Sequence, residues 1–404
     1  MRACGVVVEY NPFHNGHQYH LERARDKSRA DCMIAVMSGN FLQRGEPAII
    51  DKYERTKAAL ASGIDIVIEL PFAYAVQSSH YFALGSVRTL NEIGVSAICF
   101  GSEQGNIDDF ITAYHIQKKQ SVTYKSLLKK HLAKGLSYPA AHSAVTEQLM
   151  QGSLPIDLTK PNNILGLSYV TRVLDDKLPI ELLTIKRMNS DYHDQTIKGA
   201  IASATSIRQQ LFNYQSITEK IKHSLPEPSI NTLENYRNEA SIWHSWENYY
   251  PFLKYRVLTM SSEQLAAIHH VDEGLENRIV KTAKRATSFE HWMQLMKTKR
   301  YTWTRLQRMF VHILTNTLKT DILNVHEQRT VPYLRLLGFT KNGQRYLNQV
   351  KKQLTVPLIT QISRKEQVSL MLDERASNVY YSVLPSEQQN YFQQKDLQRP
   401  IIIN

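Results

Sequence analysis

The sequence predicts an α/β protein in which a Rossmann-like, doubly wound parallel sheet is followed by a basic, mainly α-helical C-terminal domain. Three observations lead to this prediction. Short apolar runs alternate with helical patterns over the first hundred residues, which is the order of elements in α/β proteins. The 404 residues are enough for two or three domains. The net charge rises from +3 over residues 1–215, with 23 basic and 20 acidic residues, to +9 over residues 216–404, with 26 and 17.

The predicted strands are short, apolar and rich in β-branched residues, and turn residues end each of them. They cover residues 3–8, 32–37, 64–69, 95–100 and 178–186. Helical patterns cover residues 18–28, 52–62, 79–93 and 202–212 and most of 105–175. Helices between parallel strands make right-handed crossovers, and ligands bind beyond the carboxyl ends of the strands. The loops after Val8, Met37, Glu69 and Phe100 therefore form one rim.

The segment 225–228, Leu-Pro-Glu-Pro, marks the predicted domain boundary. We therefore place a catalytic domain at residues 1–224 and a basic, mainly helical domain at residues 225–404. Four tryptophans in the second domain are expected to anchor its packing: Trp243, Trp246, Trp292 and Trp303. A short strand or tail is expected somewhere between Tyr380 and Asn404.

Most of the positive charge lies between Arg278 and Lys365, where 18 basic residues accompany three acidic ones. A nearly neutral module beside a strongly basic one indicates a catalytic unit joined to a polyanion-binding unit. The alternative is an ordinary solvated basic face, and composition alone leaves it open.

Composition excludes several other classes of protein. Hydrophobic residues make up 42% and charged residues 21%, with 16 Gly and 14 Pro, which excludes disordered and collagen-like chains. Cys4, Cys32 and Cys99 lie far apart in apolar runs, so neither a disulfide framework nor a zinc ribbon is expected. The most apolar segment, residues 64–76, contains Asp65 and Glu69, and the N-terminus lacks a signal pattern. We therefore expect a cytoplasmic protein without a membrane partner.

The strongest motif is His-Asn-Gly-His, residues 14–17, at the start of the helix that follows the first strand. A helix N-terminus presents unpaired N–H groups and a partial positive charge to a phosphate chain. Gly16, without a Cβ, permits close approach of a nucleotide. His14 and His17, three residues apart, face the same side and can donate to the α-phosphate as charge builds during attack at phosphorus. Nearby phosphate is expected to favour their protonated forms.

Two alternatives for this motif remain open. His14, His17 and His20 share a spacing of three and could bind a metal ion, although no nearby carboxylate or Cys completes a ligand set. They could also be polar residues at an ordinary helix start. His20 by itself is expected to pack or to support the other two. We predict no metal site.

A second motif, residues 201–208, combines Ser203, Thr205 and Ser206 with Arg208 at the start of a helix. The motif resembles the Ile-Ser-Ser/Ala-Thr-x-Ile-Arg element of small nucleotidyltransferases. This resemblance implies that its hydroxyl and N–H groups cap the helix over the β,γ-phosphates while Arg208 neutralises charge. Thr205 or Ser206 could instead serve only as a helix N-cap. Arg187, at the end of the preceding strand, lies on the same rim and could reach the nucleotide or remain a solvated charge.

The two motifs together resemble the HxGH-type nucleotidylyltransferase superfamily. Residues 5–17, 37–48 and 160–166 resemble more closely the bacterial tRNA(Met) cytidine acetate ligase family, and the resemblance covers essentially the whole chain. It implies a nucleotidylyltransferase fold and a ligase that activates free acetate with ATP as acetyl-adenylate. The acetyl group then passes to the exocyclic amine of the wobble cytidine in elongator tRNA(Met).

The resemblance also implies the site residues. The catalytic residues are His14, His17 and Arg208. The ATP contacts are Val7, Val8, Glu9, Tyr10, Asn11, Pro12, Phe13, His14, Asn15, Gly16, His17, Gln18, Tyr19, His20, Gly101, Asn162, Arg187 and, from the second motif, Ser206. Mg²⁺ is expected with the phosphates, although no acidic cluster marks a protein site. No acetyl-CoA pyrophosphate loop is found, so acetyl-CoA is not an expected substrate.

The remaining substrates suggest two further surfaces. The turn formed by Ser38, Gly39 and Asn40 lies on the rim and could hold a two-carbon acid, or could simply end the strand. The tRNA is expected on a basic run interleaved with Trp292, Tyr301 and Trp303. Its members are Lys281, Lys284, Arg285, Lys297, Lys299, Arg300, Arg305 and Arg308. The competing functions are an adenylyltransferase of the same fold acting on a small metabolite and a non-catalytic tRNA-binding protein.

Overall fold

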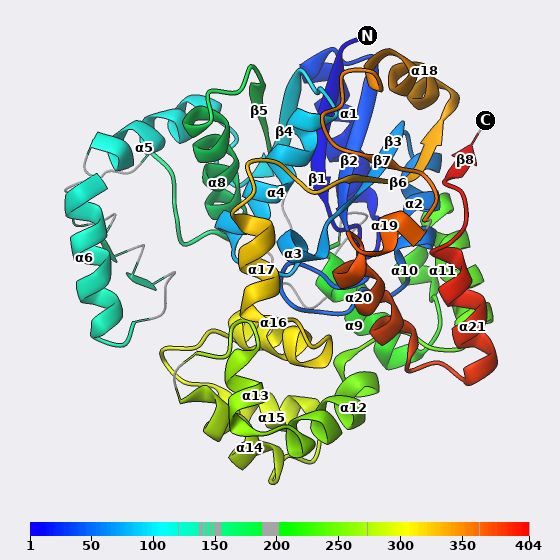
Figure 1. The fold of residues 1–404 in the computed structure, drawn as a ribbon. Coiled ribbons are helices and arrows are strands. Elements are labelled where there is room, and N and C mark those ends of the chain that lie inside the picture. Colours follow the sequence, from blue (N-terminus) through cyan, green and yellow to red (C-terminus); the bar gives the residue numbers. More distant parts are fainter. Residues whose placement is uncertain are drawn as a thin grey trace.

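A mixed, mostly parallel sheet forms the centre of the molecule (Figure 1). The computed structural model describes residues 1–119, 121–136, 140–141, 144–145, 148, 155–187, 202–272, 274–362 and 364–403. Within these ranges the sheet has eight strands in the order β5-β4-β1-β2-β3-β6-β7, with β8 paired to β6. The strands are β1 (Ala3–Val8), β2 (Cys32–Ser38), β3 (Ile66–Leu70), β4 (Ala97–Ser102), β5 (Glu181–Lys186), β6 (Leu334–Thr340), β7 (Leu358–Ile359) and β8 (Ile401–Ile403).

The five predicted strands are confirmed, with ends that differ by up to three residues. All of them run parallel, and the register aligns Val8 with Met37 and Met37 with Glu69. Because their carboxyl ends meet at one edge, the loops after β1, β2, β3 and β4 share a rim as predicted. The α/β fold class is therefore confirmed.

Helices cover both faces of the sheet and continue into a separate layer at one end (Figure 1). Those of the first part are α1 (Asn15–Ser28), α2 (Lys52–Ala61), α3 (Phe72–Ala75), α4 (Ser79–Glu92), α5 (Ile107–Lys119), α6 (Ser121–Ala133) and α8 (Pro161–Asp175). The middle part contains α9 (Ala204–Tyr214), α10 (Glu219–Lys222), α11 (Glu227–Ala240), α12 (Trp246–Thr259), α13 (Ser262–Ala267), α14 (Leu275–Ala283), α15 (Phe289–Met296), α16 (Trp303–Leu314) and α17 (Lys319–His326). The last part contains α18 (Lys341–Val350), α19 (Arg364–Gln367), α20 (Met371–Tyr381) and α21 (Ser386–Lys395).

Alternation along each strand divides the core into two layers. Ile34 and Val36 of β2 pack with α4, α8 and α18 on one face, whereas Met33 and Ala35 pack with α1 and α2 on the other. A third apolar cluster joins α11 to α16 with α20 and α21, and includes Phe41 from the loop after β2 and Phe72 at the start of α3. The helical layer is therefore packed against the rim rather than attached by a free linker.

The C-terminal residues return to the sheet, which the sequence analysis did not anticipate. β6 pairs antiparallel with β3, and β7 and β8 each pair parallel with β6. The predicted boundary at residue 225 therefore does not separate the sheet from the rest of the chain. The expected terminal strand occurs only at Ile401–Ile403, because Tyr380 and Tyr381 belong to α20.

Two smaller observations complete the comparison with the expected elements. Cys4, Cys32 and Cys99 are buried and free, as the apolar runs around them predict. Within the described ranges, no helix has both the length and the apolar character needed to cross a membrane.

Candidate active site

The loop between β1 and α1 uses both motif histidines to begin the helix. His14 is the N-cap, and its Nδ1 accepts a hydrogen bond from the Gly16 N–H at 3.0 Å. The His14 N–H in turn donates to Nδ1 of His17 at 3.3 Å. The two rings stack with centroids 3.8 Å apart. The helix therefore begins at Asn15 rather than at residue 18, and the predicted shared face of the two imidazoles is confirmed.

These hydrogen bonds fix the tautomer of each imidazole. A backbone N–H can only donate, so the Nδ1 that receives it carries no proton. Burial, together with Arg187 and Arg208, lowers the pKa of His14 to about 3, and burial and His14 hold the pKa of His17 well below its ordinary value. Both rings are therefore neutral near pH 7 without a ligand, with the proton on Nε2. The expectation that a phosphate favours the protonated forms concerns the nucleotide-bound state and stays a prediction. In either form Nε2 carries a proton and can donate.

A second group of the predicted ATP contacts gathers beside His20. A Cβ built on Gly101 would lie 3.5 Å from both His20 Cδ2 and Arg187 Cγ. Arg187 Nη1 donates to Asn162 Oδ1 at 3.2 Å. Burial and Arg187 lower the pKa of His20 to about 4. The buried Nε2 of His20 has no hydrogen-bond partner among the described residues. These residues, from β4, α8 and the end of β5, meet at one point of the rim.

The N-terminus of α8 is held there by an acidic residue that the sequence analysis did not single out. The Glu103 carboxylate accepts from Asn162 Nδ2 at 2.7 Å and from the Asn163 N–H at 2.9 Å. Asn163 Oδ1 in return accepts from the Glu103 N–H at 3.1 Å. A carboxylate is a suitable group at a helix N-terminus. Glu103 was nevertheless not predicted here, because it lies about sixty residues before the helix that it contacts and no local motif connects the two.

The second motif forms a helix cap with a different residue from the one expected. Ser203 is the N-cap of α9, and its Oγ accepts from the Ser206 N–H at 3.1 Å. The expectation of Thr205 or Ser206 as N-cap is wrong, because the helix already begins at Ala204. Ser206 is buried and its hydroxyl donates to the Ser203 carbonyl at 2.8 Å. Ile201 lies outside the described residues.

Arg208 nevertheless reaches the rim. Its Nη1 donates to the Asn11 carbonyl at 2.9 Å, and its Nη2 lies 3.1 Å from Glu46 Oε2. The Asn11 side chain accepts from the Ile49 N–H, whereas its buried Nδ2 has no partner within the described part of the chain. The structure thus brings Arg208 next to the loop that carries His14, as its effect on the pKa of His14 also indicates.

The three residues expected to hold acetate are used in different ways. Asn40 Oδ1 accepts from the Lys52 N–H at 2.9 Å, and its Nδ2 lies 3.4 Å from Ser377 Oγ. A Cβ on Gly39 would lie 2.5 Å from a carboxylate oxygen of Glu69, so this side of the turn is unsuited to a second anion. Ser38 alone keeps a buried hydroxyl without a partner among the residues described.

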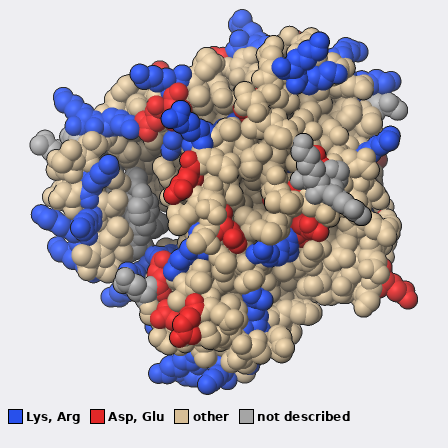
Figure 2. All heavy atoms as spheres, viewed as in Figure 1, with Lys and Arg blue, Asp and Glu red and all other residues tan. Residues whose placement is uncertain are grey.

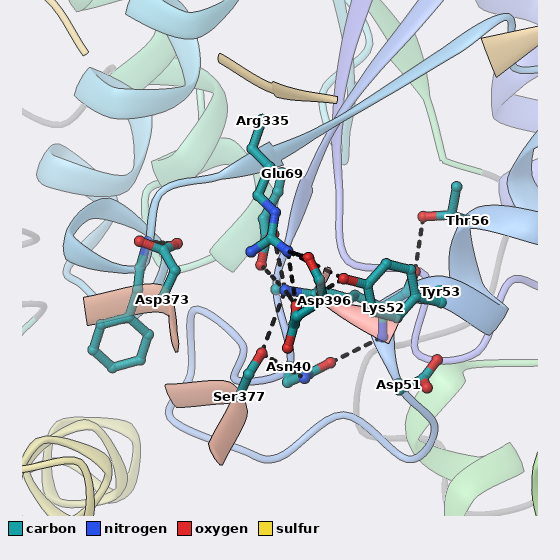
Figure 3. A network of polar contacts seen from close by, with 12 residues as sticks. Asn40, Asp51, Lys52, Tyr53, Thr56, Glu69, Arg335, Asp373, Ser377 and Asp396 are labelled. Atoms are coloured by element: carbon teal, nitrogen blue, oxygen red, sulfur yellow. Dashed lines mark hydrogen bonds and ion pairs between the residues drawn. The ribbon is translucent and has the colours of Figure 1, made fainter. Parts of the chain in front are cut away.

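A buried ionic network ties this turn to the C-terminal segments (Figure 3). Lys52 Nζ lies 3.0 Å from Glu69 Oε2 and 2.8 Å from Asp396 Oδ1. Arg335 lies 3.3 Å from the same Glu69 oxygen and 2.8 Å from the same Asp396 oxygen. Two cations and two carboxylates therefore balance, as a buried network requires. Because β6, α20 and α21 contribute to it, the last seventy residues position the rim from behind.

Arg55 is a second rim-supporting residue missed in the sequence. Its buried guanidinium donates to the Glu9 carbonyl at 2.7 Å and to the Ser38 carbonyl at 3.0 Å, and also to the Gly39 carbonyl. It therefore holds together the carboxyl ends of β1 and β2. Only its position in α2, facing the rim, reveals this role, since an Arg in a helical pattern is usually solvated.

The basic run predicted to bind tRNA is exposed only in part. Six of its basic residues are exposed: Lys281, Lys284, Arg285, Lys297, Lys299 and Arg300. Arg305 forms an ion pair with Asp272, and Arg308 is partly buried, with Nη1 3.5 Å from the Gln43 carbonyl. Trp292 is fully buried and Tyr301 nearly so, so neither can stack on a base, whereas Trp303 is 38% exposed and is not a packing anchor.

A further basic surface lies on the arm formed by α5 and α6, where Figure 2 shows many Lys and Arg side chains. Its exposed lysines are Lys118, Lys119, Lys125, Lys129, Lys130 and Lys134. No described residue of α6 is buried, and eight of its thirteen residues are exposed. This surface was not predicted from the sequence, because the first half of the chain has a net charge of only +3.

Known proteins resemble this chain over its full length. A family model described as HIGH Nucleotidyl Transferase matches residues 1–396. A tRNA(Met) cytidine acetate ligase of Oceanobacillus iheyensis is 51% identical over 403 residues, which is 100% of both chains. The protein of the same name in Bacillus subtilis is 45% identical, covering 94% of this chain and 92% of its own.

Two solved structures resemble the whole chain. The crystal structure of Thermotoga maritima TmcAL in its apo form has a TM-score of 0.92 at 33% identity and covers 100% of both chains. The structure of TmcAL bound with alpha-thio ATP has a TM-score of 0.89 at 33% identity and covers 100% of this chain and 99% of that one.

Proposed function

This chain belongs to the HIGH nucleotidyl transferase family, and we propose that it is an ATP-dependent ligase that acetylates a cytidine of tRNA(Met). The observation that carries the proposal is the full-length similarity to tRNA(Met) cytidine acetate ligases, together with an intact pair of capping histidines at the rim. The similarity to a structure bound with alpha-thio ATP supports ATP as the nucleotide. A tRNA substrate places the reaction in the cytoplasm.

In the proposed first step, a carboxylate oxygen of acetate attacks the α-phosphorus of ATP. The bond from that phosphorus to the bridging oxygen breaks, and pyrophosphate leaves. Attack brings two anions together, so the protein has to supply alignment and positive potential. The Nε2–H groups of His14 and His17 are oriented by the Nδ1 hydrogen bonds of the helix cap, and Arg187 and Arg208 supply charge.

In the proposed second step, the exocyclic amine of the wobble cytidine in elongator tRNA(Met) attacks the acetyl carbon. The bond between that carbon and the AMP oxygen breaks, the amine loses a proton, and AMP leaves. Anticodon loops present unstacked bases, which suits an enzyme that must reach an exocyclic amine. The proposal therefore needs one surface for the RNA backbone and one for the base.

Two finer assignments belong to the same proposal. For acetate we propose the buried donors Ser38 Oγ, at the last residue of β2, and Asn11 Nδ2, three residues after the adjacent strand β1. Neither has a partner in the described part of the chain. Mg²⁺, if bound with ATP, would neutralise part of the negative charge of the phosphates and so assist departure of pyrophosphate. We assign it no protein ligand, because the nearby Glu46 and Glu103 carboxylates are engaged by Arg208 and by the start of α8.

The decisive experiment is exchange of labelled pyrophosphate into ATP, measured with and without acetate and with and without tRNA. The proposal requires exchange that depends on acetate. A small-metabolite adenylyltransferase would show no acetate dependence, and a non-catalytic tRNA-binding protein would show no exchange at all. Ser38→Ala should raise the KM for acetate while leaving the KM for ATP unchanged. An unchanged acetate KM would remove Ser38 from the acetate site.

The RNA surface is tested separately by charge reversal. Replacing Lys297, Lys299 and Arg300 with Glu should weaken tRNA binding. The slope of log affinity against log salt should flatten by about 0.7–0.9 for each phosphate that the surface no longer neutralises. The matched control reverses Lys351 and Lys352, which follow α18 at the far end of the sheet. Acetate-dependent exchange should persist in both variants. Equal tRNA affinity in the two variants would refute the assignment of tRNA binding to this surface. The proposed chemistry at the rim would be unaffected.

A further inference from the structure

A second histidine cluster lies between the helical layer and the rim and shares no residue with the proposed ATP site. His269 and His270 follow α13, and His312 lies in α16. One ring nitrogen from each lies within 4.8 Å of those from the other two. In the described part of the chain no other group of three His, Cys, Asp or Glu is arranged closely enough to hold a metal ion. We propose that these three histidines bind a transition-metal ion of the Zn²⁺ class.

The hydrogen bond of His312 leaves a ring lone pair pointing into the cluster. Its Nε2 lies 3.0 Å from the Val76 carbonyl, which can only accept, so Nε2 carries the proton. Nδ1 is then an unprotonated acceptor. It is buried, in a side chain with 0% exposure, and has no partner among the residues described. A buried acceptor without a partner is costly unless something binds it, and a metal ion is a suitable occupant.

His269 and His270 supply the other two ligands. The Gln77 amide faces Nε2 of His269, with its oxygen at 3.2 Å and its nitrogen at 3.0 Å. When the amide oxygen accepts, Nε2 carries the proton and Nδ1 becomes the ligand atom. The Nε2 of His270 is buried without a partner in the described ranges. His270 has a φ of 66°, in the left-handed region that few non-glycine residues adopt, and the ring centroids of His269 and His270 lie 4.2 Å apart. That backbone conformation brings consecutive side chains together.

The donor set selects the class of ion. Three imidazoles suit Zn²⁺ and its neighbours rather than Mg²⁺ or Ca²⁺, which prefer oxygen. The carboxylate of Asp272, two residues from His270, is paired with Arg305. Arg308 lies one turn before His312 in α16, and its positive charge opposes any dication, so binding has to rest on the strong bonds between imidazole nitrogen and a transition metal. Three protein ligands leave a fourth position for water or another donor.

The groups that hydrogen-bond to the histidines connect the proposed metal site to the rim. Val76 and Gln77 belong to the loop after α3, beyond the carboxyl end of β3, whereas the ligands belong to the helical layer. Gln43, whose N–H donates to the carboxylate of the rim residue Glu9, also donates to the Gln77 carbonyl at 2.7 Å. A bound ion would therefore fasten the helical layer to the rim and stabilise the folded chain.

The test uses Zn²⁺ alone with the full-length protein, stripped by a chelator and dialysed. Metal analysis and competition against a chromophoric chelator should give one ion per chain. His270→Ala should weaken binding by more than about 100-fold, beyond the loss expected from an outer partner. His291→Ala, a partly exposed histidine elsewhere in the helical layer, and His20→Ala at the rim should retain it. Retention by His270→Ala, or no binding by the unmodified chain, overturns the proposal.

A second measurement distinguishes loss of metal binding from loss of folding in the variants. Zn²⁺ should raise the Tm of the unmodified protein and of His291→Ala in a concentration-dependent way, because an ion that binds only the folded state stabilises it. His270→Gln, which keeps a polar side chain, should fold with an unchanged circular dichroism spectrum and show no Zn²⁺-dependent rise. A Tm rise in His270→Gln equal to that of the unmodified protein would place the ion elsewhere.

Discussion

The two histidine clusters of the molecule differ in which ring nitrogen the protein itself occupies. At the rim, backbone N–H groups donate to Nδ1 of His14 and His17, which leaves Nε2–H groups as donors. In the second cluster, a backbone carbonyl accepts from Nε2 of His312, which leaves Nδ1 as an acceptor. Donors suit an anion such as phosphate, and acceptors suit a metal cation. Hydrogen-bond partners therefore decide the chemistry, while residue type and spacing alone leave both functions open.

The largest expected effect separates the two clusters directly. His17→Ala removes one donor to the reacting phosphate, so the rate of acetate-dependent pyrophosphate exchange should fall by about 10²–10³-fold. Zn²⁺ binding, measured by chelator competition, should be unchanged, because the second cluster shares no residue with the rim. His291→Ala should alter neither quantity. If His17→Ala abolished Zn²⁺ binding as well, the metal would belong to the rim and the comparison would fail.

The next effect tests the outer partners of the second cluster. Gln77→Leu removes the amide that orients His269, so the affinity for Zn²⁺ should fall by about 10–100-fold. Gln77→Glu provides a matched control, since its carboxylate can still accept from His269 Nε2 and should keep most of the affinity. An unchanged affinity in Gln77→Leu would show that His269 needs no such orientation and is not a ligand.

A smaller effect tests whether the helix cap sets the tautomer of His14. Gly16→Pro removes the N–H that donates to His14 Nδ1, and Pro is already present at the second position of α11. Losing that hydrogen bond should reduce exchange by up to about tenfold more than Gly16→Ala, which adds a Cβ but keeps the N–H. Nitrogen NMR of the imidazole should show mixed tautomers only in Gly16→Pro. Equal activity in the two variants would mean that the cap does not control the ring.

The rim was predictable because its signals are local. The apolar runs that became β1, β2, β3 and β4 each lie within a few residues of a turn, and His14 and His17 occupy one helix start. The wrong N-cap at the second motif is also a local error: Ser203, Thr205 and Ser206 can all cap, and only the backbone shows that Ser203 does.

The second cluster and the C-terminal strands were not predictable because they depend on distant pairings. His270 and His312 are separated by α14, α15 and most of α16, and no spacing rule joins them. β6 lies more than two hundred residues from its partner β3, and the network of Lys52 with Asp396 is more distant still. The expected stacking role of Trp292 failed for a related reason, since burial by α16 is a tertiary effect. Patterns within a segment do not report which segments meet.

The smallest expected effect concerns pH and the neutral state of the rim. The pKa of His14 is lowered from its ordinary value to about 3, chiefly by burial, so between those values the unfolded chain binds a proton that the folded chain does not. The free energy of unfolding should therefore fall as pH falls below about 6.5, by at most about 1.4 kcal/mol per pH unit for this residue. His14→Asn should flatten the slope of urea-derived stability against pH by that amount, whereas the partly exposed His291→Asn serves as the control. When ATP is bound, the pKa of His14 should rise above its value in the unfolded chain, because phosphate favours the protonated imidazole. The contribution of His14 to stability should then increase, rather than decrease, as pH falls. An unchanged slope in His14→Asn would mean that His14 is already charged, and its cap hydrogen bond from Gly16 would then be wrong.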